Sequence, residues 1–450
     1  MNAYNFSTQG HTNIFPIAYQ SQNIPFTEWV SLLTLGLAPL VAHIAAGVPQ
    51  PSYLYERLPK WHERLCLYNP TSILWRYAAI TDRRIRAKAW DKKDMAATNA
   101  LFWTSRGWDG SEDMVTSASP YCTLFPEHSR INLFSREMLK TIIVTLQGTQ
   151  AVVALGMALG GSSSSDGFVV FMGVDLIFFP LAFIGLVRLF CALWLTDDFA
   201  YTSLQSTRLI ESTAAKNEDA RISLDSLLDV DSGEPNSRED RFLPTSFWGS
   251  RVFRVAFLLP TLGLWVICVL FLLQPQGGKS FTITAFLVAI FYLIFLSISL
   301  VICGYYLARG RTTTAIPCIG SAWYQAYTVF LMGAGLALIV VACIETRRTA
   351  CGRWTSAPIE LGDWLACSNS RTPDVVDMGH YQNHGFGLAS GMPSRDQHNN
   401  TLGQGEFWVH NFTGTCLGML HSTLIKHSST LEEVDLKTIQ GIIQNNPSSL

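Results

Sequence analysis

A few ionisable side chains lie inside long apolar runs of this sequence, where each one suggests chemistry at membrane depth. Asp175 falls in FVVFMGVDLIFF, and Arg188 follows in the same run. A charge at the centre of a membrane helix costs about 2.5 to 3.5 kcal/mol, so such residues are candidate sites by default. In one continuous helix the two would lie about 220° apart around the axis and roughly 20 Å apart along it, so they cannot pair there.

Partners for these residues must therefore come from other helices. For Asp175 we expect either a hydrogen bond to Gln147 or Gln150, or a place in a polar pathway for an ion or small solute. Arg188 and His43 are predicted to lie at comparable depth in the cytosolic half of the membrane. The long side chain of Arg188 alternatively reaches the cytosolic headgroups, which the short side chain of Asp175 cannot do.

A second candidate is the basic run ITDRRIRAKAWDKKD at residues 80–94. Its six cations are Arg83, Arg84, Arg86, Lys88, Lys92 and Lys93. Such a run is typical of nucleic-acid binding, a membrane surface or a solvated face. Because it lies between two membrane helices, we expect no nucleic acid, and an interfacial helix whose cations bind anionic lipids of the cytosolic leaflet. The open alternative is that these charges only orient the chain and contact water.

Motifs for catalysis are missing from the sequence. It contains no Gly-rich phosphate loop, nucleophile elbow or paired-carboxylate helix motif. We therefore predict no enzyme, no cofactor and no metal site. The two function classes that remain are a non-enzymatic membrane organiser or sensor, which the composition of the non-membrane segments favours, and a transporter-like or channel-like pathway.

The elements that must position these residues are six apolar blocks, each long enough to cross about 30 Å of hydrocarbon. Open sheets are excluded there, because their unpaired backbone groups are not tolerated in lipid. The sequence thus predicts an all-α polytopic helical membrane protein with about six spans, a helical cytosolic loop and a soluble C-terminal tail. The expected spans are 29–48, 139–160, 168–195, 252–273, 281–307 and 325–344.

The distribution of Lys and Arg predicts the orientation, since cytosolic loops carry an excess of both. Segment 49–138 holds thirteen, segment 196–251 holds six, and residues 1–28 hold none. We therefore expect a folded, Trp-rich cytosolic loop at 49–138, a partly disordered cytosolic loop at 196–251, and non-cytosolic segments at 1–28 and 345–450. The membrane is expected to be the plasma membrane or a secretory-pathway endomembrane.

Three glycosylation acceptors agree with this orientation, because Asn5, Asn399 and Asn411 all fall in the segments expected outside the cytosol. Arg347 and Arg348, directly after the sixth block, leave open five spans with a cytosolic tail. GMALG at 156–160 is a GxxxG pattern, so Gly156 and Gly160 are a possible homo-oligomer contact or a contact within the bundle.

Two runs in the first cytosolic segment carry a resemblance. YNPTSILWRYAAITDRRIRAKAW and MAATNALFWTSRGWDGSEDM, followed by further apolar spans, resemble a family of uncharacterised multi-pass membrane proteins of filamentous fungi. The resemblance covers roughly residues 28–345 and implies the multi-span topology. It implies no activity, cofactor or catalytic residue.

Overall fold

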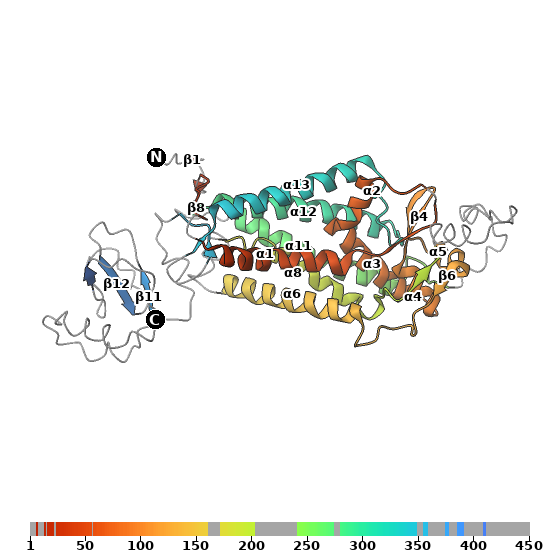
Figure 1. Ribbon diagram of the computed structural model, residues 1–450. Coiled ribbons are helices and arrows are strands. Elements are labelled where there is room, and N and C mark those ends of the chain that lie inside the picture. The colour runs from red at the N-terminus through yellow and green to blue at the C-terminus, as the bar shows by residue number, and fades with distance from the viewer. Residues whose placement is uncertain are drawn as a thin grey trace, which may run out of the picture.

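The computed structural model describes residues 24–55, 57–160, 172–202, 241–273, 280–348 and 354–358, with short pieces at 6–7, 13–14, 16–21, 374–377, 385–390 and 408–410. Within these residues, five helices are long and apolar enough to cross a membrane, and they form an elongated bundle (Figure 1). They are α1 (Phe26–Gly47), α6 (Arg136–Gly160), α11 (Trp248–Leu273), α12 (Ile283–Ala308) and α13 (Ala322–Glu345). The expected all-α polytopic fold is confirmed.

The third expected span is a broken segment, where a continuous helix was expected. Its described part, from residue 172 onward, begins with turns and continues through α8 (Phe179–Gly185), η4 (Leu186–Phe190) and η5 (Ala192–Trp194). Pro180 stands in the first turn of α8, where its missing N–H is harmless. Irregular backbone is tolerated at membrane depth only where protein covers it. This segment meets that condition, because it packs against α1 and α6 and buries most of its apolar side chains.

This broken segment connects the two ends of the bundle. Val174 N–H donates to Thr346 Oγ1 over 3.0 Å, just beyond the end of α13. Near the other end, Arg188 Nε donates to Thr141 Oγ1 over 2.9 Å, close to the start of α6. The end that carries residues 49–135 is called the cap end below, and the opposite end is the tail end. Within the described residues, this segment therefore runs from one end of the bundle to the other beside the five long helices.

The chain enters α1 and leaves α13 at the tail end. Gln20 N–H donates to Ile344 O over 3.1 Å, and the strand before α1 pairs with the strand before α12. The strands here are β1 (Phe6–Ser7), β2 (Asn13–Ile14), β8 (Ser280–Phe281), β9 (Arg347–Arg348) and β10 (Trp354–Thr355). Farther along, β11 (Asp374–Asp377), β12 (Gly385–Ser390) and β13 (Trp408–His410) form an antiparallel sheet. The segment before α1 and the segment after α13 thus lie at the same end of the bundle.

The cap end combines short helices with two small sheets, where the sequence had suggested helices alone. Phe102 and Trp103 favour a strand, and Gly107, at φ 102°, supplies the left-handed residue of the following turn. The strands are β3 (Pro51–Tyr53), β4 (Leu101–Thr104), β5 (Gly107–Asp109), β6 (Cys122–Leu124) and β7 (Ala200–Tyr201). The helices are α2 (Trp61–Leu65), η2 (Cys66–Tyr68), α3 (Pro70–Arg86), α4 (Lys92–Asn99), α5 (Asp113–Ser117) and η3 (Ser119–Tyr121).

Helix α3 is the centre of the cap end. Asn69 caps it by accepting from the Thr71 N–H over 2.9 Å, and Pro70 occupies the first position, where its fixed φ suits a helix. It packs against α1, α11, α12 and η4. Trp75, Tyr77 and Ile80 are each at most 1% exposed. The expected interfacial helix is therefore wrong for α3, which is a core helix joining the cap to the bundle.

Candidate functional site

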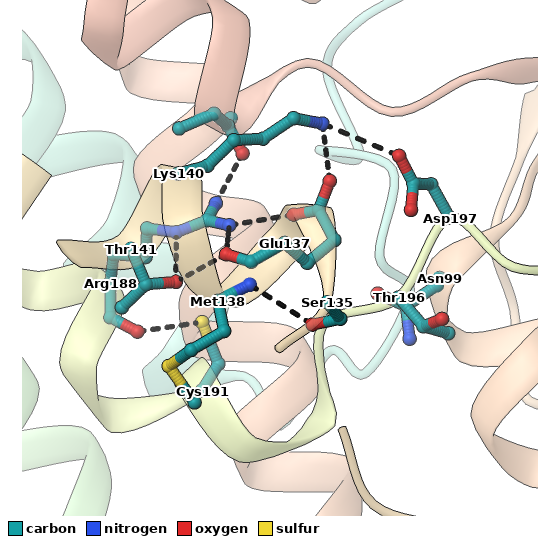
Figure 2. Close-up of polar contacts among 12 residues, drawn as sticks. Asn99, Ser135, Glu137, Met138, Lys140, Thr141, Arg188, Cys191, Thr196 and Asp197 are labelled. Atoms are coloured by element: carbon teal, nitrogen blue, oxygen red, sulfur yellow. Dashed lines mark hydrogen bonds and ion pairs between the residues drawn. The ribbon is translucent and has the colours of Figure 1, made fainter. Parts of the chain in front are cut away.

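Arg188 is the centre of a buried polar cluster at the cap end, shown in Figure 2. Its guanidinium is 1% exposed. Nε donates to Thr141 Oγ1 over 2.9 Å, and an Nη donates to Glu137 Oε2 over 2.6 Å. Glu137 and Thr141 lie four residues apart in the first turns of α6, so both side chains face the same neighbour. One helix face therefore supplies the carboxylate and the hydroxyl that hold Arg188.

Arg188 uses all five of its N–H donors. Besides the two bonds above, it donates to the backbone carbonyl oxygens of Ala46 and Glu137, and to the Tyr77 hydroxyl over 3.2 Å. A guanidinium carries five donors in a fixed plane. The side chain is thus fixed to α1, α3 and α6 at once. The expectation that Arg188 reaches the headgroups is wrong, because these acceptors hold it inside the bundle.

The cluster continues outward through Lys140. The Lys140 ammonium pairs with Glu137 and lies 3.4 Å from Asp197 Oδ2, and its side chain is 35% exposed (Figure 2). Glu137 therefore lies between a buried arginine and a lysine that reaches solvent. This geometry suits a structural ion-pair network more than a free charge available to a ligand.

His43 lies near this cluster without joining it. The side chain is 2% exposed, and neither ring nitrogen has a hydrogen-bond partner among the described residues. It packs at Gly185, where an added Cβ would meet His43 Nδ1 at 3.9 Å. Arg188 and His43 thus lie at the same end of the bundle, in agreement with the prediction of comparable depth. No hydrogen bond joins them.

Asp175 lies far from that cluster, toward the tail end. Its Oδ1 is buried without a hydrogen-bond partner, 2.6 Å from the position of a Cβ built on Gly173. The expected partners do not reach it: none of the hydrogen bonds described for this chain joins Asp175 to Gln147 or Gln150, and Gln150 is exposed on the outside of α6. The five intramembrane candidates therefore do not converge at one depth.

A second buried cluster, around Asp82, was not among the predicted sites. Arg254 of α11 donates to both Asp82 oxygens, from Nε over 3.0 Å and from an Nη over 2.9 Å. Arg86 Nε donates to Asp82 Oδ2 over 3.1 Å, and the Ser250 hydroxyl donates to Oδ1. Asp82 is 1% exposed. This carboxylate of α3 therefore joins α11 through Arg254 and Ser250, and Arg86 binds it from α3 itself.

The basic run divides into buried and exposed members. Arg83 and Arg86 are 0% and 2% exposed, so the expectation that they bind lipid headgroups is wrong. Arg83 donates to the carbonyl oxygens of Gly110 over 2.6 Å and Thr312 over 3.1 Å, whereas Arg86 pairs with Asp82 and Glu112. Apart from Asp82, which lies on α3 itself, these acceptors come from segments outside α3 that fold around it.

The other four cations of the run lie nearer the surface. Arg84 is half-buried between two indole rings, 5.5 Å from the Trp90 centroid and 5.6 Å from that of Trp194. Lys88, Lys92 and Lys93 are exposed. The lipid-surface prediction therefore stays open for the three lysines and only in part for Arg84.

The remaining predicted sites are only partly visible. Asn5, Asn399, Asn411 and the surroundings of Gly160 lie outside the described residues. An added Cβ on Gly156 would meet nothing within 4 Å, so self-association through this residue stays a prediction. In the part of the chain that the structure describes, no group of three or more His, Cys, Asp or Glu side chains is placed to hold a metal ion.

Comparisons with known proteins found no match: no family model, no curated protein and no solved structure resembles this chain at the level searched.

Proposed function

We propose that this chain is a non-enzymatic multi-pass membrane protein that organises or senses the cytosolic leaflet. The observation that supports this proposal is that the buried arginines pair with neighbouring helices. Arg188 and the arginines around Asp82 donate hydrogen bonds to neighbouring elements. The polar side-chain atoms without a partner, in Asp175 and His43, lie toward opposite ends of the bundle. A conducting pathway needs polar groups that line one route and exchange partners with the solute. Paired groups that join helices support a rigid scaffold instead.

The proposed orientation places the cap end in the cytosol. Residues 49–138 hold thirteen of the chain's 32 Lys and Arg, whereas residues 1–28 hold none. Six crossings return the chain to the end where it began, which supports a non-cytosolic tail over the five-span alternative. The membrane would be the plasma membrane or a secretory-pathway endomembrane, and the resemblance to multi-pass proteins of filamentous fungi is proposed as the family relation.

Glycosidase digestion of the full chain, expressed in a eukaryotic cell, tests this orientation. We expect a mobility shift that the double variant Asn399→Gln/Asn411→Gln abolishes. Proteolysis of sealed microsomes should spare the tail and cut the exposed cap. Loss of the tail from the cytosolic side, without any glycan, would refute the orientation.

The lipid-reading part of the proposal now rests on Lys88, Lys92 and Lys93. Basic residues close to a membrane surface gain about 1 kcal/mol each from anionic lipid, so three lysines provide at most about 3 kcal/mol before salt screening. Trp61 and Trp248 are 69% and 71% exposed near the same end, where indole rings favour headgroup depth. The exposed lysines therefore lie on the part of the chain that would meet the cytosolic leaflet.

Lipid that copurifies with the full chain provides the test. The chain is extracted from membranes that contain phosphatidylcholine and phosphatidylserine, and the bound lipids are quantified by mass spectrometry. We expect Lys88→Gln/Lys92→Gln/Lys93→Gln to lower the bound phosphatidylserine fraction, and the matched triple Lys→Arg variant to keep it. Equal fractions in all three proteins would refute the lipid reading.

A flux assay separates the two function classes. Proteoliposomes that contain the full chain should leak ions and small solutes at the rate of protein-free vesicles. A flux that Asp175→Asn or His43→Ala abolishes would replace the proposal with the pathway alternative.

A further inference from the structure

A small cavity lies beside Arg76 at the cap end, and no part of the proposed function uses it. It forms where the end of α1, α3, the start of β4 and the loop after α12 meet. Its volume is about 20 Å³, and its lining includes Gly47, Ser72, Arg76, Leu101, Ala315 and Ile319. A site needs roughly 10 to 15 Å³ to hold one water molecule. The cavity thus has room for a water molecule or a monatomic ion, in walls that are mainly apolar.

Arg76 brings to this cavity a positive charge that is not paired with any carboxylate among the described residues. The residue is 8% exposed, and its partners are neutral: the carbonyl oxygens of Gly47 at 3.0 Å and Asn99 at 3.2 Å, and Asn99 Oδ1 at 3.4 Å. None of the hydrogen bonds described for Arg76 uses its Nε. Arginine stays protonated in proteins, so the charge cannot be removed by proton loss. A buried cation of this kind is costly unless an anion lies near it.

The surrounding charges do not supply that anion. Glu137 is a carboxylate near Arg76, and it is already paired with Arg188 and Lys140. Arg188 itself adds a second positive charge to the neighbourhood. Arg83 differs, because three carboxylates act on it. The region around Arg76 therefore carries an excess of positive charge next to a cavity.

We propose that this cavity binds a monatomic anion of chloride size, held by the Arg76 guanidinium. A monatomic anion fits this volume, and a weakly hydrated halide tolerates apolar walls. The bound ion would connect the end of α1, α3 and the loop after α12, and so stabilise the docking of the cap onto the bundle. The site does not depend on the lipid-reading proposal, because it lies on other residues.

Anion-dependent unfolding of the full chain tests the site. Thermal midpoints are measured in detergent with sodium chloride or sodium gluconate at equal ionic strength. A ligand at 100 times its Kd shifts the unfolding equilibrium about 100-fold toward the folded state, so the midpoint should rise saturably with chloride alone. Arg76→Gln should remove the rise. Arg309→Gln removes an exposed arginine that lies over Tyr305, and should keep it.

A second variant and a direct measurement keep the site testable if Arg76→Gln does not fold. Ala315→Val retains the arginine but fills the cavity, so it should also remove the chloride response. Crystals of the unmodified chain grown in bromide should show an anomalous peak beside Arg76. A cavity that holds water only, or a chloride response equal in all variants, would overturn the proposal. A bromide peak without any chloride-dependent midpoint would mean an adventitious ion only, and would overturn it too.

Discussion

Asp82→Asn is expected to be among the most damaging single substitutions outside the long helices. Asp82 accepts four hydrogen bonds, from Arg86, twice from Arg254 and from Ser250. Asparagine keeps the shape but replaces one oxygen by an NH₂ group. If this group takes the place of Oδ2, it faces the donors Arg86 Nε and an Arg254 Nη, now at 3.1 and 2.9 Å. The Arg254 guanidinium then loses its counter-charge in a site that water does not reach, and Arg86 is left with Glu112 as its ion-pair partner.

The expected magnitude follows from that loss. Removing one partner of a buried ion pair costs about 3 to 5 kcal/mol, because the other charge stays buried and unpaired. The matched control is Asp198→Asn, the same change at an exposed carboxylate, which should stay within about 0.5 kcal/mol of the unmodified chain. Equilibrium unfolding in mixed lipid and detergent micelles, followed by circular dichroism, measures both.

A double-mutant cycle with Arg254→Gln then isolates the pair. Residues in direct contact show interaction energies of about 0.5 to 3 kcal/mol, so the double variant should be less unstable than the sum of the single variants. An Asp82→Asn protein within about 1 kcal/mol of the unmodified chain, or strictly additive effects, would refute the view that this carboxylate joins α3 to α11.

Three further predictions concern other parts of the fold. Gly36→Ala should destabilise the chain by about 1 to 3 kcal/mol, because the new Cβ meets a backbone oxygen at 2.4 Å, whereas Gly263→Ala, with nothing within 4 Å, should be neutral or stabilising in the same unfolding assay. Arg188→Met should lower the free energy of unfolding by about 3 to 5 kcal/mol, and the double variant with Glu137→Gln should recover part of this loss. An equal loss in the single and the double variant would contradict the prediction. Burial raises the pKa of Cys318 to about 11, so its reaction with iodoacetamide should be slow at pH 8 and speed up about tenfold per pH unit toward pH 10. Mass spectrometry of its peptide checks this against the denatured chain, and equal rates in both states at pH 8 would contradict it.

The long spans were predictable to within a few residues, because an uninterrupted apolar run of that length has one stable solution in lipid. The broken third span was not. Its run from 168 to 195 has the composition of a helix, and only the cover provided by α1 and α6 allows turns before Pro180. Sequence composition contains no information on which span will be interior.

The basic run shows a second limit of the sequence. It gives the sign and number of the charges but not their acceptors. The carbonyl oxygens that accept hydrogen bonds from Arg83 belong to Gly110 and Thr312. Such long-range contacts leave no pattern in a single sequence. A signal for the Asp82 cluster was nevertheless present, since Asp82 lies four residues before Arg86 and Arg254 lies inside the fourth apolar run.

The buried arginines share one physical task that connects topology with fold. Helices leave their last carbonyl oxygens without intrahelical partners, and cations are favoured there by the helix dipole. Arg188 and Arg76 donate to Ala46 and Gly47, the last two residues of α1. Arg76 also donates to the last carbonyl of α4, and Arg254 donates to Leu307 near the end of α12. At the cap end, the excess of arginine that orients the chain therefore also satisfies the helix ends that face it. A neutral substitution at these positions would leave carbonyl groups unpaired as well as change the charge, which is why we expect it to destabilise the cap before it alters the topology.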